Sequence, residues 1–300
     1  MSAAAPGPAW VVVPTYDEAE NVVPLVRAVL AELDGAGADG RVLVVDDASP
    51  DGTADLAEAV GREDPRVGVL RRPSKQGIGP AYRDGFRRAL DGGAGLVIEM
   101  DCDFSHDPRA LPVLIAAAAD ADLVLGSRYV PGGGVARWGP LRRAVSRGGC
   151  RYAQVILGVP VRDLTGGFKC FRREVLEAIP LDEVTAAGYG FQIEMTYRAL
   201  LAGFRVVEVP ITFTERERGR SKMSRGIVWE AAALVPRLRR RLGRRRGVER
   251  GDGVGGGQLL ERDGDGASQT IPRLILERPR SRSVKVIGTS TTRKPASRAR

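Results

Sequence analysis

The sequence predicts an α/β fold built on a Rossmann-like, doubly wound and mostly parallel sheet. Short β-branched runs bounded by proline, glycine or charged residues are typical of buried strands. Stretches with helical spacing of apolar residues separate most of these runs, which favours parallel strands joined by helical crossovers. Polar clusters follow several runs, at the strand ends where such sheets bind ligands. Six strands are expected, at residues 10–14, 41–45, 66–70, 95–100, 122–126 and 205–209.

Helices are expected between these strands. In the segment ENVVPLVRAVLAELDG, Val22, Val26, Val29 and Leu33 recur at helical spacing, and Pro24 fits the first turn of a helix. A second helix is expected from about Thr53. Further helices are expected at residues 79–91, 108–119, 141–157, 190–202 and 224–242.

The net charge of +9 is concentrated at the end of the chain. Residues 236–300 carry 18 Lys and Arg against 6 Asp and Glu, so the preceding residues are slightly acidic. Because residues 247–300 contain too few apolar side chains to offset the ordering entropy, they are expected to form a disordered basic tail. A flexible N-terminus at residues 1–9 and one catalytic domain at residues 10–223 complete the expected organisation.

The helix expected within residues 224–246 has two interpretations. Its apolar residues lie near one face, and arginines crowd its end. This pattern is typical of a helix that lies on an anionic membrane surface. The alternative is a helix packed on the catalytic domain. No transmembrane helix is expected, since the longest apolar run, at residues 110–119, is too short to cross a bilayer. No secretory signal is evident, and three distant cysteines fit a reducing cytosol.

The stretch VIEMDCDFSHDP, at residues 97–108, predicts a metal site beside a helix start. Asp101 and Asp103 share one face of an extended segment, and their carboxylate oxygens suit Mg²⁺ or Mn²⁺. A cation held by two carboxylates keeps positions for substrate phosphates, which suggests a diphosphate. Asp107 is expected instead to cap a helix that begins at Pro108. His106, the sole histidine, is expected to support this site structurally.

Two other strand ends carry candidate ligand groups. PTYDE places Tyr16 and Glu18 where a base and a ribose could be held, although an ordinary polar loop would have the same composition. The next strand ends in Asp46 and Asp47, and only one of them should reach a pocket because strand side chains alternate. The chain has no Walker loop, GxSxG motif or GxGxxG after the first strand, so triphosphatase, serine hydrolase and dehydrogenase functions lack their defining residues.

Several blocks occur in the order typical of one enzyme family. They are VVVPTYDEAENV, VLVVDDASPDGT, KQGIGPAYRDGF, MDCDFSH, LGSRYVPGG, SRGG, DLTGGFKCFRREVL, GYGFQIEM and ERERGRSKM. Over about residues 10–230 the chain resembles the polyprenol (dolichol) monophosphate mannose synthases of inverting glycosyltransferase family 2. The resemblance implies a GT-A fold and transfer of mannose from GDP-mannose to polyprenyl monophosphate, with Mg²⁺ or Mn²⁺ as cofactor.

The resemblance also assigns site residues. The guanosine-binding set corresponds to Pro14, Tyr16, Glu18, Val45 and Asp47. The diphosphate and metal centre corresponds to Asp101, the backbone of Cys102, and Asp103. The groups that clasp the donor phosphates correspond to Arg128, Arg216 and Lys222. The acceptor-phosphate site corresponds to Arg142 and Ser146, with Arg128 shared. The family usually has alanine at Cys102, and some relatives have a metal-binding glutamine where this chain has Ser105.

The expected chemistry is a single inverting displacement with Asp103 and Arg128 as catalytic residues. A polyprenyl phosphate oxygen attacks the anomeric carbon of mannose, and no general base is needed because the phosphate is already ionised. The resemblance implies a peripheral location on the cytoplasmic face of the cell membrane, with a separate integral membrane protein as a further partner. Two alternatives remain: another donor such as UDP-glucose, or a nucleic-acid binder that uses the basic tail. Nucleic acid is not the expected partner.

Overall fold

The computed structural model describes residues 7–186, 188–215, 233–243 and 285–286. The strands are β1 (Ala9–Thr15), β2 (Gly40–Asp46), β3 (Val67–Arg71), β4 (Leu96–Glu99), β5 (Leu123–Ser127), β6 (Gly134–Ala136), β7 (Lys169–Arg172), β8 (Val206–Pro210), β9 (Thr212–Thr214) and β10 (Lys285–Val286). The labelled α-helices are α1 (Ala19–Gly35), α2 (Thr53–Glu63), α3 (Ile78–Asp91), α4 (Leu111–Ala117), α5 (Pro140–Leu157), α6 (Arg173–Ala178) and α7 (Gly188–Leu201). Short 3₁₀ turns occur at Pro108–Ala110 and Leu181–Glu183, and residues 233–243 form a further helix.

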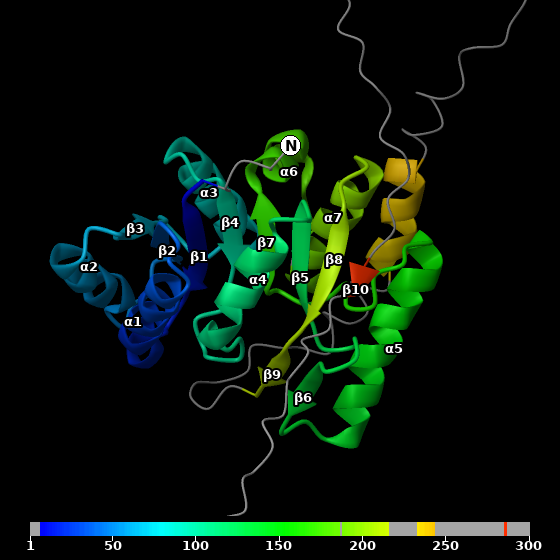
Figure 1. The fold of residues 1–300 in the computed structure, drawn as a ribbon, viewed down its shortest axis with the longest axis horizontal. Helices are drawn as coiled ribbons and strands as arrows, with labels where there is room; N and C mark the ends of the chain where they lie inside the picture. The colour runs from blue at the N-terminus through cyan, green and yellow to red at the C-terminus, as the bar shows by residue number, and fades with distance from the viewer. Residues whose placement is uncertain (1–6, 187, 216–232, 244–284, 287–300) are drawn as a thin grey trace, which may run out of the picture.

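The central sheet has the order β10-β8-β5-β7-β4-β1-β2-β3 (Figure 1). All neighbours are parallel except β7, which runs antiparallel between β4 and β5. The prediction of a doubly wound, mostly parallel sheet is confirmed. Strand β7 was not among the predicted strands, because its four residues, KCFR, lack an alternating or continuous apolar pattern.

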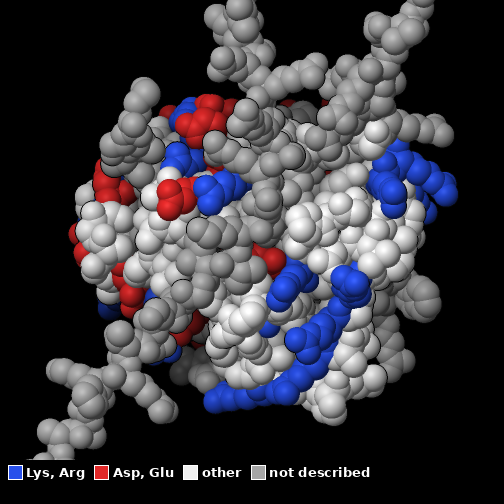
Figure 2. All heavy atoms as spheres, turned by 45° about the vertical axis from the view of Figure 1, so that its right-hand side comes forward, with Lys and Arg blue, Asp and Glu red and all other residues white. Residues whose placement is uncertain are grey.

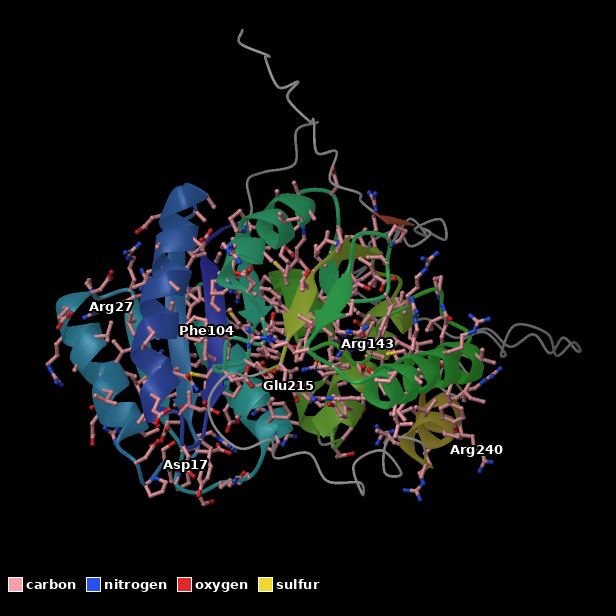
Figure 3. The ribbon with its side chains drawn as sticks, turned by 90° about the horizontal axis from the view of Figure 1, so that it is seen from below. Asp17, Arg27, Phe104, Arg143, Glu215 and Arg240 are labelled. Carbon is pink, nitrogen blue, oxygen red and sulfur yellow. The ribbon has the colours of Figure 1, made fainter. Side chains whose placement is uncertain are left out.

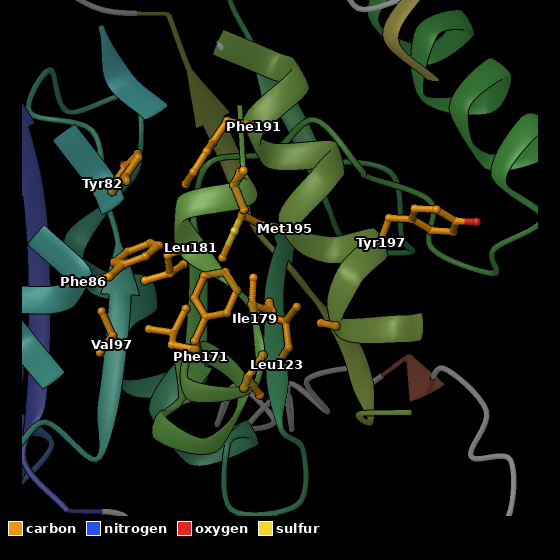
Figure 4. Close-up of a cluster of buried hydrophobic side chains, with 14 of the residues drawn as sticks. Tyr82, Phe86, Val97, Leu123, Phe171, Ile179, Leu181, Phe191, Met195 and Tyr197 are labelled. Atoms are coloured by element: carbon orange, nitrogen blue, oxygen red, sulfur yellow. The ribbon is translucent and has the colours of Figure 1, made fainter. Parts of the chain in front are cut away.

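Helices cover both faces of the sheet, and each face has its own apolar core. Successive residues of β1 point to opposite faces, so Val11 and Val13 enter one core and Val12 enters the other. The first core lies under α1, α2 and α4, and the second lies under α3, α5, α6, α7 and the helix at residues 233–243. In the second core the rings of Tyr82 and Phe191 stack with centroids 5.8 Å apart (Figure 4). This double burial explains why the strands are almost uniformly apolar.

The helix at residues 233–243 packs on the domain. Val235, Leu238 and Leu242 are buried in the second core. Arg241 donates a hydrogen bond of 2.5 Å to the carboxylate of Glu194, which is fully buried on α7. The described part of this helix therefore turns its apolar side chains inward, which favours packing on the domain over an apolar membrane contact. The rest of the predicted segment, at residues 224–232 and 244–246, lies outside the described residues.

The structure departs from the expected organisation at both ends. Ala9, assigned to the flexible N-terminus, begins β1. Lys285–Val286, assigned to the disordered tail, form β10 and pair in parallel with Val207 and Glu208 of β8. Two residues are too short a run to show a strand pattern in the sequence. Within the described ranges, no helix has the length and apolar character needed to cross a membrane.

Candidate active site

A cavity of about 560 Å³ lies beyond the carboxyl ends of the central strands. Figure 3 looks toward this edge, where Asp17 follows β1, Phe104 follows β4, Glu215 follows β9, and Arg143 lies on α5. Non-glycine residues with positive φ occur in the described chain at Asp17, Ala48, Phe104 and Arg137, with φ between 55° and 60°. All four belong to loops at this edge. Strained backbone that gathers around one cavity is typical of a functional site.

One end of the cavity is lined by the loop after β1. Pro14, Tyr16 and Glu18 line the cavity, together with Lys75 from the segment before α3. The Lys75 ammonium lies 3.6 Å from the centre of the Tyr16 ring, a close cation–π contact. Glu18 is held in place by a 2.8 Å hydrogen bond donated by Asn21. This end offers an aromatic face, a carboxylate and a cation to a ligand.

The two aspartates at the end of β2 have different surroundings. Asp47 lines the cavity, and one of its oxygens accepts hydrogen bonds of 3.1 Å from the backbone N–H groups of Gln76 and Gly77. Its other oxygen pairs with the buried guanidinium of Arg72. Asp46 faces the β1 side, where it accepts a 3.0 Å hydrogen bond from Thr15. As expected from strand alternation, one of the pair lines the cavity and the other stabilises the turn.

Val45 has a different position from the other residues of the expected guanosine set. Its side chain is fully buried in the second core and does not belong to the cavity lining. Only its backbone, which accepts a 3.5 Å hydrogen bond from Thr15, lies near the strand end. The structure therefore gives the Val45 side chain a packing role.

The acidic loop after β4 lines the middle of the cavity. Asp101, Cys102 and Asp103 all contribute to the lining. Asp103 is 6% exposed and accepts a 3.0 Å hydrogen bond from the backbone N–H of Ser105. Asp107 lies outside the cavity and accepts a 3.0 Å hydrogen bond from the backbone N–H of Arg109, so its predicted capping role is confirmed. The stretch thus divides into a cavity-lining pair and a turn cap.

His106 supports the acidic loop from inside. It is buried, and burial lowers its pKa to about 4, so the ring is neutral at neutral pH. Its Nδ1 accepts a 3.2 Å hydrogen bond from the backbone N–H of Asp101, which leaves Nε2 as the protonated nitrogen. The ring stacks on Phe168 at 5.0 Å between centroids. These contacts fit the structural role that the sequence suggested.

Arg128 reaches the cavity as part of a buried ion pair. Its guanidinium donates two hydrogen bonds of 2.7 Å to the carboxylate of Asp163, and its backbone N–H donates another of 2.9 Å. Thr165 accepts a further 2.8 Å hydrogen bond from the same guanidinium. Burial would raise the pKa of Asp163, but the charge and hydrogen bonds of Arg128 outweigh it and hold the pKa below its usual value. The pair is therefore fully ionised at neutral pH.

The backbone of Asp163 is fixed from behind by a second buried acid. Glu208, on β8, is fully buried and accepts hydrogen bonds of 3.0 and 2.9 Å from the backbone N–H groups of Arg162 and Asp163. Glu208 of the central sheet thus fixes the loop at Asp163, and Asp163 in turn fixes the guanidinium of Arg128. This chain of contacts positions one guanidinium at the cavity wall.

Arg142 and Ser146 come from the first turns of α5. Arg142 lines the cavity, lies 4.3 Å from the centre of the Trp138 ring, and pairs with Glu215. Ser146 accepts a 2.6 Å hydrogen bond from the Tyr129 hydroxyl but does not belong to the cavity lining. The remaining two predicted residues, Arg216 and Lys222, lie outside the described residues.

Sequence reasoning missed four residues that shape this site. Asp163, Thr165 and Gly166 belong to the block DLTGGF, to which the resemblance assigned no site residue. A Cβ on Gly166 would lie 3.3 Å from the carbonyl oxygen of Gly126, so a larger residue at this position would be crowded against the backbone of the cavity wall. Lys75 begins the block KQGIGPAYRDGF, to which the resemblance assigned no site residue. The sequence signal for the DLTGGF loop was one acidic residue followed by two glycines between expected elements. It did not identify a role, because the contacts of this loop, with Arg128 and Gly126, are distant in sequence.

The donor groups of the acidic loop fit a hard divalent cation. Asp101 and Asp103 present two carboxylates to one cavity. Among the described residues, no third His, Cys, Asp or Glu joins them to form a group that could hold a metal by itself. The Oγ of Ser105 is buried in the same cavity wall without a hydrogen-bond partner among the described residues. Two carboxylates leave coordination positions for substrate phosphates, as Mg²⁺ sites commonly do.

Known proteins resemble this chain in sequence and in fold. The family described as glycosyl transferase family 2 matches residues 10–179. An undecaprenyl-phosphate mannosyltransferase of Micrococcus luteus is 49% identical over 75% of this chain and 91% of its own length. A polyprenol monophosphomannose synthase of Mycolicibacterium smegmatis is 48% identical over 80% of this chain and 91% of its own length.

Solved structures agree on the fold. Glucosyl-3-phosphoglycerate synthase from Mycobacterium tuberculosis, solved in complex with Mn²⁺, uridine diphosphate and glucosyl-3-phosphoglycerate, has a TM-score of 0.55 over 79% of this chain and 80% of its own. At 20% identity this likeness concerns the fold alone, and it supports a GT-A-like arrangement of sheet and helices. Given the family match over more than half of its length and the close relatives, the chain is a glycosyltransferase and belongs to glycosyl transferase family 2.

Proposed function

We propose that this protein transfers mannose from GDP-mannose to a polyprenyl monophosphate, with inversion at the anomeric carbon. The observation that carries the proposal is that Asp101, Asp103, Arg128 and Arg142 line one cavity. An acidic pair suits a cation that neutralises a nucleoside diphosphate, and two arginines suit phosphate oxygens. The names of the two close relatives support mannose as the sugar and a polyprenyl phosphate as the acceptor.

The donor is assigned to the end lined by Tyr16, Glu18, Lys75 and Asp47. The Tyr16 ring offers a face for the base, and the two carboxylates offer acceptors for base or ribose hydrogen-bond donors. The diphosphate then lies toward Asp101 and Asp103. In this arrangement the sugar lies between the acidic loop and Arg128.

The displacement needs no general base from the protein. A phosphate monoester, with a second pKa of about 6, is largely ionised at neutral pH and can attack the anomeric carbon directly. The bond from that carbon to the donor diphosphate breaks, and GDP leaves with the electron pair. A bound Mg²⁺ or Mn²⁺ would supply charge neutralisation on the leaving diphosphate, held by Asp101 and Asp103.

The arginines offset the repulsion between two anionic reactants. Arg128, fixed by Asp163, holds its guanidinium at the wall without reorganisation during the reaction, which is the efficient form of electrostatic stabilisation. Arg142 is assigned to the phosphate of the acceptor. Its partner Glu215 is half-exposed, so an incoming phosphate can compete for the guanidinium.

A peripheral location at the cytoplasmic face of the membrane is part of the proposal, because the polyprenyl chain of the acceptor would stay in a bilayer. An integral membrane protein that receives or positions the lipid is a further proposed partner. The relatives' names support the polyprenyl phosphate acceptor, and a lipid acceptor supports a location at a membrane surface.

A donor and acceptor assay tests the proposal. Purified protein with undecaprenyl phosphate and Mg²⁺ is expected to form a mannolipid from labelled GDP-mannose, and EDTA is expected to stop the reaction until Mg²⁺ or Mn²⁺ is restored. Labelled UDP-glucose, offered in parallel, is expected to give little product. Preferential transfer from UDP-glucose would contradict GDP-mannose as the donor. The absence of transfer from either donor would contradict polyprenyl phosphate as the acceptor.

Substitution of Lys75 tests the donor end of the cavity. Lys75→Met keeps the length of the side chain but removes its charge over Tyr16, a contact worth on the order of 1 kcal/mol. The KM for GDP-mannose is therefore expected to rise about fivefold, with little change in kcat. Arg41→Met is the control, because Arg41 makes a similar contact with Trp10, 5.6 Å from the ring centre, away from the cavity. Equal KM values for the two variants would contradict the assignment.

A further inference from the structure

Helix α5 exposes an apolar stripe on the surface. Five large apolar side chains are exposed in the described part of the chain, and four of them belong to α5. They are Leu141, Val145, Tyr152 and Val155, with exposed fractions of 77%, 49%, 39% and 58%. The fifth, Leu56, lies alone on α2. Such a concentration on one helix is unusual for a surface that meets only water.

The four side chains share one face of the helix. At about 100° per residue, they fall within a sector of about 80° around the axis. The residues of α5 that are buried, Cys150, Ala153 and Leu157, lie on the opposite side. The helix is therefore apolar both toward the core and toward the outside.

Arginines border the stripe on both sides. Helix α5 carries Arg142, Arg143, Arg147 and Arg151 and no acidic residue. Figure 2 shows Lys and Arg side chains gathered in a band beside an uncharged strip, on the side where Figure 1 places α5. An apolar stripe flanked by cations is the pattern of a helix that lies in the headgroup region of an anionic bilayer.

The basic surface continues beyond α5. Arg239, in the helix at residues 233–243, donates a hydrogen bond of 2.5 Å to the carbonyl oxygen of Ile156, near the end of α5. Arg237 and Arg240 of the same helix are exposed, while its apolar side chains face the core. This second helix thus offers charge to the surface, and α5 offers both charge and apolar area.

We propose that α5 is the surface by which the protein docks on an anionic lipid bilayer. Leu141, Val145, Tyr152 and Val155 would enter the headgroup region, and the flanking arginines would contact lipid phosphates. The purpose of the docking rests on the proposed function: Arg142 lies on the same helix and lines the cavity. A lipid phosphate can then reach Arg142 while its polyprenyl chain stays in the bilayer.

Vesicle binding of the full chain, measured without donor or acceptor, tests the docking. The unchanged protein is expected to sediment with vesicles of phosphatidylcholine and phosphatidylglycerol, and to bind less in high salt or to phosphatidylcholine alone. Val145→Asp/Val155→Asp is expected to weaken binding by about tenfold or more, because two charges would enter the headgroup region. Leu56→Asp is the control, the same kind of change at an exposed apolar residue on α2, and should bind as the unchanged protein does.

Other occupants of the stripe give other results. If the double variant binds vesicles as well as the control does, α5 is not the docking surface. If the unchanged protein is a dimer that the double variant splits, a second copy covers the stripe. If the double variant melts several degrees below Leu56→Asp, another part of the chain covers it. Each of these results overturns the docking and leaves mannosyl transfer untouched, whereas vesicle binding without any transfer overturns the proposed function alone.

Discussion

Asp103→Ala is expected to reduce mannosyl transfer at least about 1000-fold, to the background of the assay. The carboxylate is 6% exposed in the wall of the cavity, where it would hold the cation that neutralises the diphosphate. Losing it removes the ligand that lies deepest in the proposed metal site. The measurement is the initial rate with labelled GDP-mannose and undecaprenyl phosphate at saturating Mg²⁺.

Asp107→Ala is the matched control for Asp103. It removes a carboxylate from the same loop, four residues away, but one that caps a turn outside the cavity. Loss of such a cap costs about 1 kcal/mol of stability. The control should therefore melt slightly earlier and retain its transfer rate. If Asp103→Ala retained a comparable rate, the acidic loop would not be the centre of the reaction.

Asp163→Asn is expected to reduce transfer by about 100-fold or more and to destabilise the protein by about 3–5 kcal/mol. An asparagine can accept with only one oxygen, so the buried guanidinium of Arg128 loses its counter-charge and one of its two 2.7 Å hydrogen bonds. Arg128 would then leave the geometry that serves the reacting phosphates. The expected loss is in kcat more than in the KM for GDP-mannose, because Tyr16 and Asp47 are untouched.

Glu194→Gln separates this positioning role from simple loss of stability. Glu194 is also fully buried and paired with arginines, Arg198 at 2.8 Å and Arg241 at 2.5 Å, but it does not line the cavity. The two variants should show similar losses of thermal stability. Below both melting temperatures, Glu194→Gln should keep the kcat of the unchanged protein. An equal loss of kcat in both variants would contradict the positioning role of Asp163 and leave it only a role in stability.

The stability that the Asp163 pair contributes depends on pH in a defined direction. The pKa of Asp163 is held below its ordinary value of 3.8, so folding favours the ionised form. Its contribution is fully present above that ordinary pKa and is lost as the pH falls through the lower value of the folded state. The free energy of unfolding, measured by urea titration with circular dichroism, should therefore fall more steeply as the pH drops below 3.8 in the unchanged protein than in Asp163→Asn, which has no carboxylate to protonate at this position.

The sequence carried enough local information to predict the sheet and one part of the site. Strands such as β1 and β2 are continuous apolar runs, and Asp101 and Asp103 follow β4 directly, so pattern and position suffice. The capping role of Asp107 could be derived for the same reason, since a cap and its turn are adjacent in sequence.

The missed features depend on contacts between distant residues. β7 is short and runs antiparallel, and its place between β4 and β5 follows from pairing partners more than 40 residues away. Asp163 is 35 residues from Arg128, and no local pattern marks the pair. The apolar face of the helix at residues 233–243 is compatible with lipid or with protein, and only packing against the second core distinguishes the two.

The packing of that last helix also sets the size of the unit that folds. The family match ends at residue 179, yet β8 contributes a strand beside β5, and Val235, Leu238 and Leu242 complete the second core. A polypeptide that stopped at residue 179 or 223 would leave that core open and would separate Glu194 from Arg241. These contacts extend the folding unit at least to residue 243, beyond the residues 10–179 that match the family.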